Sequence, residues 1–232
     1  MRKGLLAVLG TISWCAAVLI FGVSIGCQCL RAQAATAGEL RHQPESFPRA
    51  VRGTELTALQ WVRYEGPFWE DGSGEEVAAV AGLVLENTGG VTVACGAVVL
   101  EWEDAVLVFE LSVLLPGERV LVLEKNRQQF PQVLPRDCYG WSRGEYTEKM
   151  GQVAVEENGG MTMAVINRTS DRIPLVQISY KTKDPESGLF LGGVTYTVEV
   201  RNLGPGEKRL LTPYHYVCGG SMVVRVLLYP EL

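Results

Sequence analysis

Histidine is scarce in this 232-residue sequence, which contains only His42 and His215. A hydrolase triad would need one of them beside a nucleophile, and no Gly-x-Ser-x-Gly segment is present. Protein zinc sites are usually marked by several closely spaced pairs of ligands. Here only His215 and Cys218 form such a pair, which favours a surface histidine beside a structural cysteine. The sequence therefore predicts no enzyme, no metal site and no cofactor.

Basic residues are also few once the first 34 residues are set aside. That segment contains three basic residues and no acidic one, so 18 of the 21 basic residues remain against 26 acidic ones, a net charge of −8. A surface of this sign repels phosphate backbones and anionic lipid headgroups. Nucleic acid is therefore excluded as an expected partner, and basic or neutral partners are favoured.

The sequence lacks an EF-hand, although residues 71–76 (Asp-Gly-Ser-Gly-Glu-Glu) superficially resemble a calcium loop. An EF-hand loop needs glycine at its sixth position and glutamate six residues later, whereas this chain has Glu76 and Gly82 there. A solvated hairpin loop is the expected structure, and a looser calcium site is the alternative.

Cysteine is sparse beyond the N-terminal segment. Only three of the six cysteines follow that segment: Cys95, Cys138 and Cys218. An odd number allows at most one internal disulfide and leaves one thiol. We predict the pair Cys138–Cys218, because each follows a Pro-Gly-Glu strand by a similar interval, whereas Cys95 lies within an apolar run. Three buried free thiols are the alternative, since cysteine packs well as a small apolar residue.

Residues 1–34 read as a targeting segment. Two positive residues precede a stretch without charge over positions 4–30, and Ala-Gln-Ala at 32–34 gives the pattern that signal peptidases accept. The stretch is long enough for a spanning helix, which needs ~20 residues. A retained membrane anchor, cleavage after Ala34 and a lipoprotein modified at Cys27 are the alternatives. In each of them the rest of the chain is exported, either membrane-anchored or secreted.

Helical periodicity is absent from the exported part. Residues 35–54 are polar, contain two prolines and are expected to form a tether. From Leu56 onward, short runs that alternate apolar and polar residues are separated by turn sequences. Clear examples are residues 107–113 and 194–201. This pattern predicts an all-β fold built as a β-sandwich.

Two similar turn sequences organise this part of the chain. Residues 114–119 read Leu-Leu-Pro-Gly-Glu-Arg, and residues 203–208 read Leu-Gly-Pro-Gly-Glu-Lys. Proline fixes φ at the first corner of a turn, and glycine adopts the conformation that the second corner needs. Each sequence is therefore expected to reverse one strand into the next.

The order of these signals suggests that one β-unit is used twice. Asn87 and Asn167, each followed by turn residues, are 80 residues apart, and Pro116 and Pro205 are 89 apart. The difference of nine residues fits a longer loop at 184–193 in the second unit. Loops accept such insertions at little cost, because closure entropy grows with the logarithm of length.

The chain resembles the FxLYD-type, immunoglobulin-like domains of exported bacterial proteins. In those domains a strand ends at Asn, a strand of alternating apolar residues follows the turn, and a Leu-x-Pro-Gly-Glu corner precedes a late strand. The matching positions in the first unit are 82–87, 98–102 and 114–118. In the second unit they are 163–167, 176–180 and 203–207. The resemblance implies an envelope setting and no common catalytic residues.

We therefore predict two tandem immunoglobulin-like β-sandwich units behind one N-terminal hydrophobic helix. One larger sandwich is the alternative. The expected parts are the signal or anchor at residues 1–34, the tether at 35–54, a first unit at 55–125, an irregular connector at 126–146 and a second unit at 147–232.

We interpret the chain as a non-catalytic cell-envelope protein that binds a protein partner at the cell surface or acts as a spacer. An uncleaved N-terminal helix would also bind it to the membrane. The alternative is a carbohydrate-binding module, because aromatic side chains beside carboxylates can bind sugar rings. Its binding residues would be Trp61, Tyr64, Phe68 and Trp69. Aromatic residues at the end of a sandwich also commonly cap the core.

Overall fold

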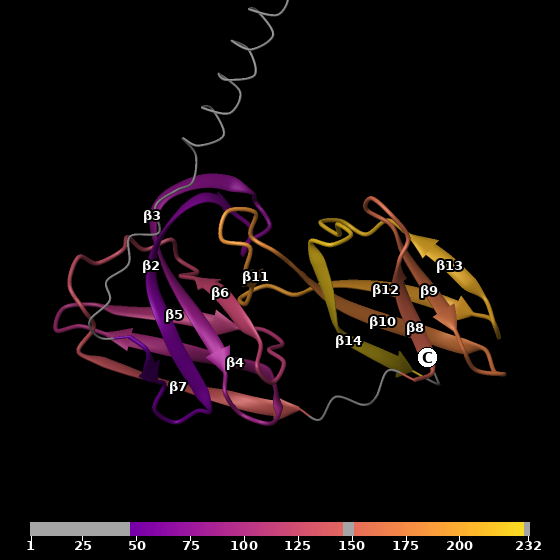
Figure 1. Ribbon diagram of the computed structural model, residues 1–232, viewed down its shortest axis with the longest axis horizontal. Helices are drawn as coiled ribbons and strands as arrows, with labels where there is room; N and C mark the ends of the chain where they lie inside the picture. Colours follow the sequence, from indigo (N-terminus) through magenta and orange to yellow (C-terminus); the bar gives the residue numbers. More distant parts are fainter. Residues whose placement is uncertain (1–46, 146–150, 230–232) are drawn as a thin grey trace, which may run out of the picture. The chain divides into compact units, whose positions relative to one another are not determined.

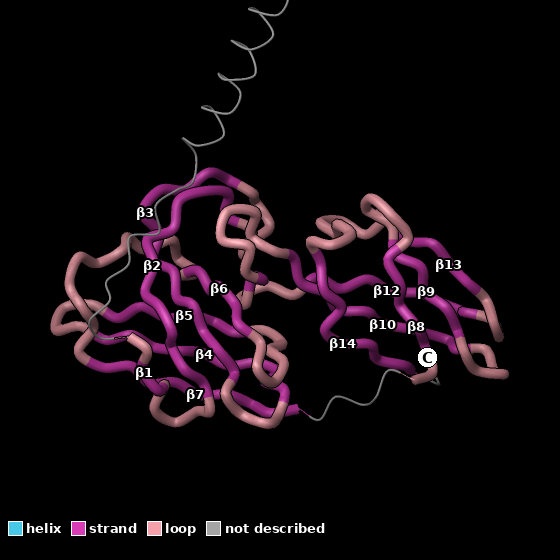
Figure 2. Tube along the Cα trace, in the orientation of Figure 1, coloured by secondary structure: helices cyan, strands magenta, loops and turns pink. Residues whose placement is uncertain are grey.

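The computed structural model describes residues 47–145 and 151–229, and the regular elements in these ranges are all β-strands (Figures 1 and 2). The all-β fold class is therefore confirmed for the described part of the chain. The predicted N-terminal helix at residues 1–34, and residues 35–46 of the predicted tether, lie outside the described residues. Within the described ranges, no helix is both long enough and apolar enough to span a membrane.

The first set of strands forms a sandwich of two sheets. One sheet has the order β1-β2-β3-β6-β11 and contains β1 (Arg49–Ala50), β2 (Leu56–Phe68), β3 (Glu75–Asn87), β6 (Arg119–Leu123) and β11 (Phe190–Leu191). The other has the order β5-β4-β7 and contains β4 (Thr92–Glu101), β5 (Val106–Leu111) and β7 (Asp137–Glu145). Their inner faces share one core, in which the Trp61 ring centre lies 5.5 Å from that of Trp102 and 5.9 Å from that of Phe109.

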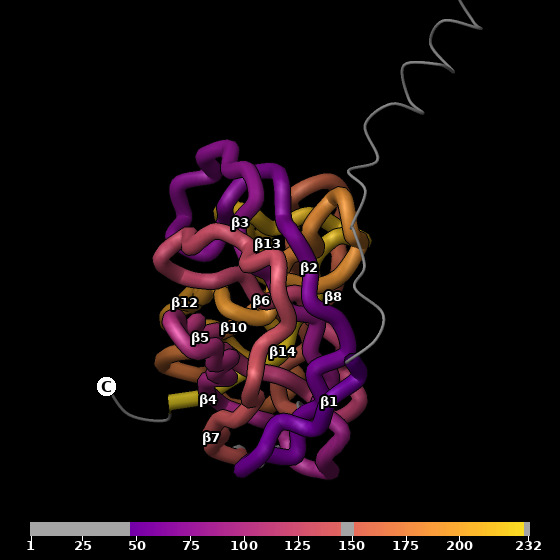
Figure 3. Tube along the Cα trace, turned by 90° about the vertical axis from the view of Figure 1, so that its left-hand side faces the viewer, coloured from indigo at the N-terminus to yellow at the C-terminus, as the bar shows by residue number. Residues whose placement is uncertain are grey.

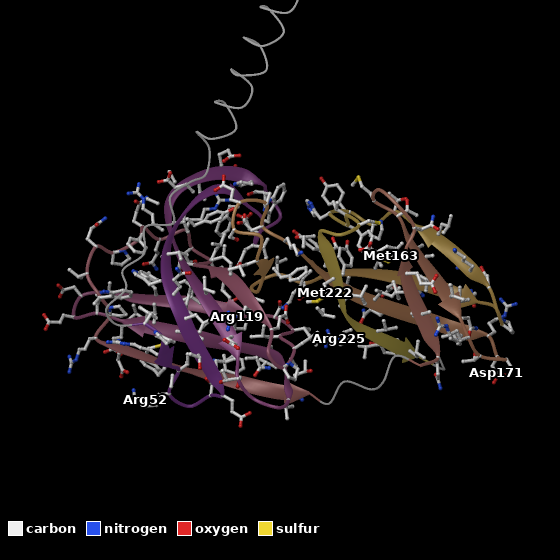
Figure 4. The ribbon with its side chains drawn as sticks, in the orientation of Figure 1. Arg52, Arg119, Met163, Asp171, Met222 and Arg225 are labelled. Atoms are coloured by element: carbon white, nitrogen blue, oxygen red, sulfur yellow. The ribbon has the colours of Figure 1, made fainter. Side chains whose placement is uncertain are left out.

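The second set of strands also forms two sheets around one core. One sheet has the order β13-β9-β8 and contains β8 (Val153–Glu157), β9 (Met163–Asn167) and β13 (Lys208–Leu211). The other has the order β12-β10-β14 and contains β10 (Ile173–Thr182), β12 (Tyr196–Leu203) and β14 (Ser221–Tyr229). Met163, labelled in Figure 4, lies in this core with Val176 and Tyr180. Burial of such a side chain stabilises the fold by about 1.5–3 kcal/mol.

The two sets pair their strands in the same order and share a hydrogen-bonding pattern at the asparagine corners. The Asn87 side-chain amide donates to the Leu114 carbonyl oxygen at 3.1 Å, and the Asn167 amide donates to the Leu203 carbonyl oxygen at 3.1 Å. Both asparagines are buried at the end of a strand, β3 or β9. Each amide thus holds the start of a Pro-Gly-Glu turn against the end of β3 or β9.

The glutamates of the two turns also make equivalent bonds. Glu118 Oε2 accepts from the Leu115 backbone N–H at 2.7 Å, and Glu207 Oε2 accepts from the Gly204 N–H at 2.7 Å. Each carboxylate closes its own turn, because it binds the N–H three residues before it. The residue pattern Leu-x-Pro-Gly-Glu therefore specifies the same local structure at both places.

Residues 126–146, predicted to be an irregular connector, instead contain strand β7, which pairs with β4 along nearly its whole length. Two glycines, at 140 and 144, lie within this strand. In the sheet, a Cβ on Gly140 would lie 2.3 Å from the Ala97 carbonyl oxygen, and a Cβ on Gly96 would lie 2.6 Å from the Trp141 oxygen. Glycine is required here because the two backbones approach too closely for a side chain.

The end of the predicted tether is likewise part of the sheet structure. β1 pairs with β2, and Figure 3 shows the two side by side. The Gly140 N–H donates to the Arg52 carbonyl oxygen at 2.9 Å, which joins this segment to β7. Residues 47–54 therefore do not form a polar linker, contrary to the prediction.

The longer loop predicted at 184–193 joins the second set of strands to the first. Within it, β11 pairs in parallel with β6. The Gly192 N–H donates to the Leu121 carbonyl oxygen at 2.7 Å, and Ser112 donates from its backbone N–H to the Gly192 oxygen at 2.9 Å. Leu189 packs on a second apolar cluster, formed on the outer side of β2, β3 and β6. The nine additional residues thus supply a structural contact as well as a turn.

Candidate functional site

The aromatic residues predicted to bind carbohydrate are mostly buried. Trp61, Tyr64 and Phe68 have exposed fractions of 1%, 3% and 0%. β2 continues to Phe68 and both faces of its sheet are covered, so Trp61 packs in the inner core while Tyr64 and Phe68 pack on the outer cluster. The prediction of a sugar-binding loop is therefore wrong for these three side chains, which cap and fill cores.

Trp69, the fourth predicted residue, lies in an aromatic cluster around His215. The His215 ring centre is 5.2 Å from Trp69, 4.8 Å from Tyr196 and 4.1 Å from Tyr214. Burial lowers the pKa of His215 below its ordinary value, which favours the neutral form of the ring. Among the described residues, no group of three or more His, Cys, Asp or Glu side chains could hold a metal ion. The ring contacts join Trp69 of the first strand set to His215 and Tyr196 of the second.

Glu70, which sequence reasoning did not single out, lies beside this cluster. The side chain of Glu70 as a whole is partly exposed, but its carboxyl group, which sets the pKa, is buried. Burial raises the pKa of Glu70 to about 8 despite hydrogen bonds from the backbone of Leu123 (3.1 Å) and Gly193. A Cβ on Gly193 would lie 2.0 Å from Glu70 Oε2. The Glu70 carboxyl group thus fills the space that this glycine leaves at the junction.

The predicted disulfide between Cys138 and Cys218 is not formed, and all three described cysteines are free thiols. Cys138 is buried on β7 within the first core, whereas Cys218 lies between β13 and β14 beside the second core. Cys95 is exposed on β4. The similar sequence intervals did not bring the two sulfur atoms together, because the two cysteines belong to different cores.

The acidic loop at 71–76 is held by an arginine from a distant turn. Arg127 donates to Asp71, and it donates to Glu75 Oε2 at 2.6 Å. Its guanidinium carbon lies 4.9 Å from the centre of the Phe68 ring. Hydrogen bonds from Ser73, together with Arg127, lower the pKa of Asp71 to about 2. The arginine therefore occupies the position that a cation would take beside these carboxylates.

The outer face of sheet β5-β4-β7 carries an exposed apolar surface. In one row across the strands, Val99 on β4 lies between Val108 on β5 and Tyr139 on β7. The neighbouring rows add Trp141 and Val106. The exposed fraction is 56% for Trp141, 48% for Val106 and 36% for Val108. We call these five residues the outer-face patch. Contiguous exposed apolar surface of this kind marks binding sites in soluble proteins.

The corresponding face of the second strand set is polar along β12 and the middle of β10, whereas β14 places the apolar Leu227 and the aromatic Tyr229 on it. In sheet β12-β10-β14, the row equivalent to Val108–Val99–Tyr139 is Glu199–Gln177–Leu227. The next row consists of Thr197, Ser179 and Arg225, the last of which is labelled in Figure 4. The fold therefore accepts polar side chains at the positions of Val99, Val106 and Val108, and apolar residues are not required there by the sandwich itself.

Charged residues surround the outer-face patch. Asp137 pairs with Arg52 at 2.6 Å, and the Arg52 guanidinium carbon lies 5.6 Å from the centre of the Tyr139 ring. Lys125 pairs with Glu110 at 2.7 Å. These pairs are exposed and contribute about 0–1 kcal/mol each to stability. An apolar centre with a charged rim is the composition that protein interfaces show.

Comparisons of the chain with protein-family models, with curated proteins and with solved structures found no match.

Proposed function

We propose that the chain is an exported, non-catalytic β-sandwich protein that binds a protein partner through the outer-face patch. One observation carries this proposal: Val99, Val106 and Val108 of the patch are apolar, whereas the equivalent residues of the second strand set, Gln177, Thr197 and Glu199, are polar. Two copies of one architecture thus differ at the positions where a partner can be bound. The export part of the proposal is supported by the sequence of residues 1–34, which would place the sandwiches outside the cytoplasm, either anchored to the membrane or secreted.

The two strand sets, in this proposal, are tandem immunoglobulin-like units of the FxLYD type. The shared strand order and the equivalent bonds of Asn87 and Asn167 support it. Because β7 belongs to the first sandwich, the first unit would extend to about residue 145, and the link between the units would be short. The pairing of β11 with β6 would restrict motion of the first unit relative to the second.

The proposed function is tested by giving the first face the residues of the second. The double variant Val99→Gln, Val108→Glu copies Gln177 and Glu199 and is expected to fold, since surface substitutions usually change stability by less than about 0.5 kcal/mol. Surface crosslinking on cells, followed by mass spectrometry, should recover the partner of the unmodified chain. Capture should fall by about tenfold or more in the variant, because loss of an interface centre costs more than about 1.4 kcal/mol.

A matched control removes an apolar side chain elsewhere. Leu210 on β13 is 54% exposed and lies outside the outer-face patch, so Leu210→Gln should leave capture unchanged. Equal capture by the double variant and the unmodified chain would show that the outer-face patch is not the binding surface.

A further inference from the structure

We propose that the partner bound by the outer-face patch is a second copy of this chain, with the two β5-β4-β7 sheets packed face to face. This inference rests on the proposed function, because it assigns the partner of the same surface. The arrangement is a dimer whose twofold axis lies between the two sheets and runs across the strands. Packed sheets lie about 10 Å apart, so side chains of both outer faces interdigitate.

The charges along β7 carry the inference. Asp137, Tyr139, Trp141 and Arg143 are alternate residues of β7, and the register places them with Glu101, Val99, Ala97 and Cys95 of β4. At one end of the face Asp137 and Glu101 outnumber Arg52, which pairs with Asp137, while Arg143 lies at the other end and the middle is apolar. Arg143 is exposed, and the Asp137 side chain is 36% exposed. Arg143 is therefore accessible to another molecule, and Asp137 is accessible while it pairs with the exposed Arg52.

A twofold axis across the strands turns this gradient into self-complementarity. It places each β7 over the partner's β7 in the opposite direction, so Arg143 meets the partner's Asp137 twice in the dimer. Trp141 then meets Tyr139 between those charge pairs. Glu110, which is paired with Lys125, stays at the β5 edge of the sheet. Isologous interfaces of this kind are the commonest in soluble homo-oligomers.

The alternative axis, parallel to the strands, is less favourable. It would place β7 over the partner's β5. Trp141 would then face Glu110, the acidic residue of β5, and Arg143 would face no acidic residue. A wholly basic partner would meet like charge at Arg143, and a wholly acidic one would meet it at Asp137 and Glu101. The second copy fits both ends, and its opposed charges offset the repulsion between two chains that are acidic as a whole.

The test uses the full chain, expressed together in two versions that carry different epitope tags. A photo-crosslinking benzoylphenylalanine replaces Trp141 or, as the control, Tyr229 at the equivalent position of the second set. In membranes and in the secreted fraction, position 141 should give a crosslinked product of twice the chain mass that carries both tags. Position 229 should not give this product. A product at 141 that contains only a different protein would overturn the second copy as partner while leaving the proposed function in place. No product at position 141 would contradict both.

Charge reversal tests the orientation. Arg143→Glu chains and Asp137→Arg chains each place like charges together in a homodimer, so each product should fall by about threefold or more when expressed alone. When the two variants are expressed together, the glutamate introduced in one chain meets the arginine introduced in the other. The unchanged Arg143 and Asp137 then form the second pair, and the mixed product should be restored. Failure of the mixed product to exceed the two homodimers would exclude the axis across the strands.

Discussion

At the scale of a single residue, the Glu70 carboxyl group shows how the junction between the strand sets responds to pH. Its pKa rises from an ordinary value of 4.5 to about 8, chiefly because burial disfavours the charged form. Folding therefore favours the protonated acid. The contribution to stability is fully present below pH 4.5 and is lost as the pH rises through about 8.

We expect the free energy of unfolding to decrease between pH 5 and pH 9 through Glu70. Glu70→Gln keeps a neutral side chain of the same shape, so the variant should lose this part of the pH dependence and be relatively more stable at high pH. Urea unfolding at several pH values measures the effect. Glu103→Gln, at an exposed position on the turn between β4 and β5, serves as the control and should keep the slope of the unmodified chain. A Glu70→Gln slope equal to the control would contradict the assignment.

At the scale of the strands, the alternation of apolar and polar residues predicts burial correctly where one face of a strand is exposed to solvent. It fails where both faces of the strand are covered. Along β5 it predicted the burial of Leu107 and Phe109 correctly. Along β2, inner and outer clusters cover both faces, so the aromatic side chain of Tyr64 packs in a core that no periodicity marks. Strand β7 was missed because Gly140 is needed for close approach, a contact set by a distant strand.

The outer-face patch could be predicted only in part. The residues Val106 and Val108 alternate with buried neighbours, so their outward direction follows from the sequence. Their position on one face with Trp141 depends on the pairing of β7 with β4, in which the partners are at least 36 residues apart, as for Glu101 and Asp137. Sequence patterns report which face a residue occupies, but the neighbours on that face come from tertiary structure.

Lys181 on β10 makes a buried ion pair with Glu118 of the first turn, at 3.2 Å with exposed side-chain fractions of 0% and 8%. We expect Lys181→Met to lower the free energy of unfolding by about 3–5 kcal/mol, because it leaves the Glu118 carboxylate buried without a cation. Adding Glu118→Gln should recover most of the loss, since the amide still accepts from Leu115. Denaturant unfolding of the single and double variants gives both values. Lys125→Met, in the exposed pair with Glu110, should cost less than about 1 kcal/mol. A double variant as unstable as Lys181→Met would contradict this account.

At the scale of the whole molecule, the longer loop determines whether the two strand sets unfold together. The loop at 184–193 contributes the β11 pairing, the contact of Leu189 with the outer cluster and the bond from Tyr64 Oη to Asp184 Oδ1 at 3.2 Å. Tandem sandwiches joined only by a short linker tend to unfold independently, because interfaces between domains are small. Here the contacts of one loop couple two cores.

Replacing residues 185–193 with a four-residue turn, the size of the connection between β4 and β5, should separate the two unfolding events. Without the loop, the Val62 and Leu121 side chains of the outer cluster lose their cover, so the first strand set should unfold at a lower temperature than the second. Differential scanning calorimetry should then record two transitions where the unmodified chain gives one. The control inserts nine Gly and Ser residues between Glu103 and Asp104, in an exposed turn, and it should keep a single transition because the junction is unchanged. A single transition in the shortened chain would show that the cores are coupled by the other junction contacts, among them the Lys181–Glu118 pair, without any need for β11.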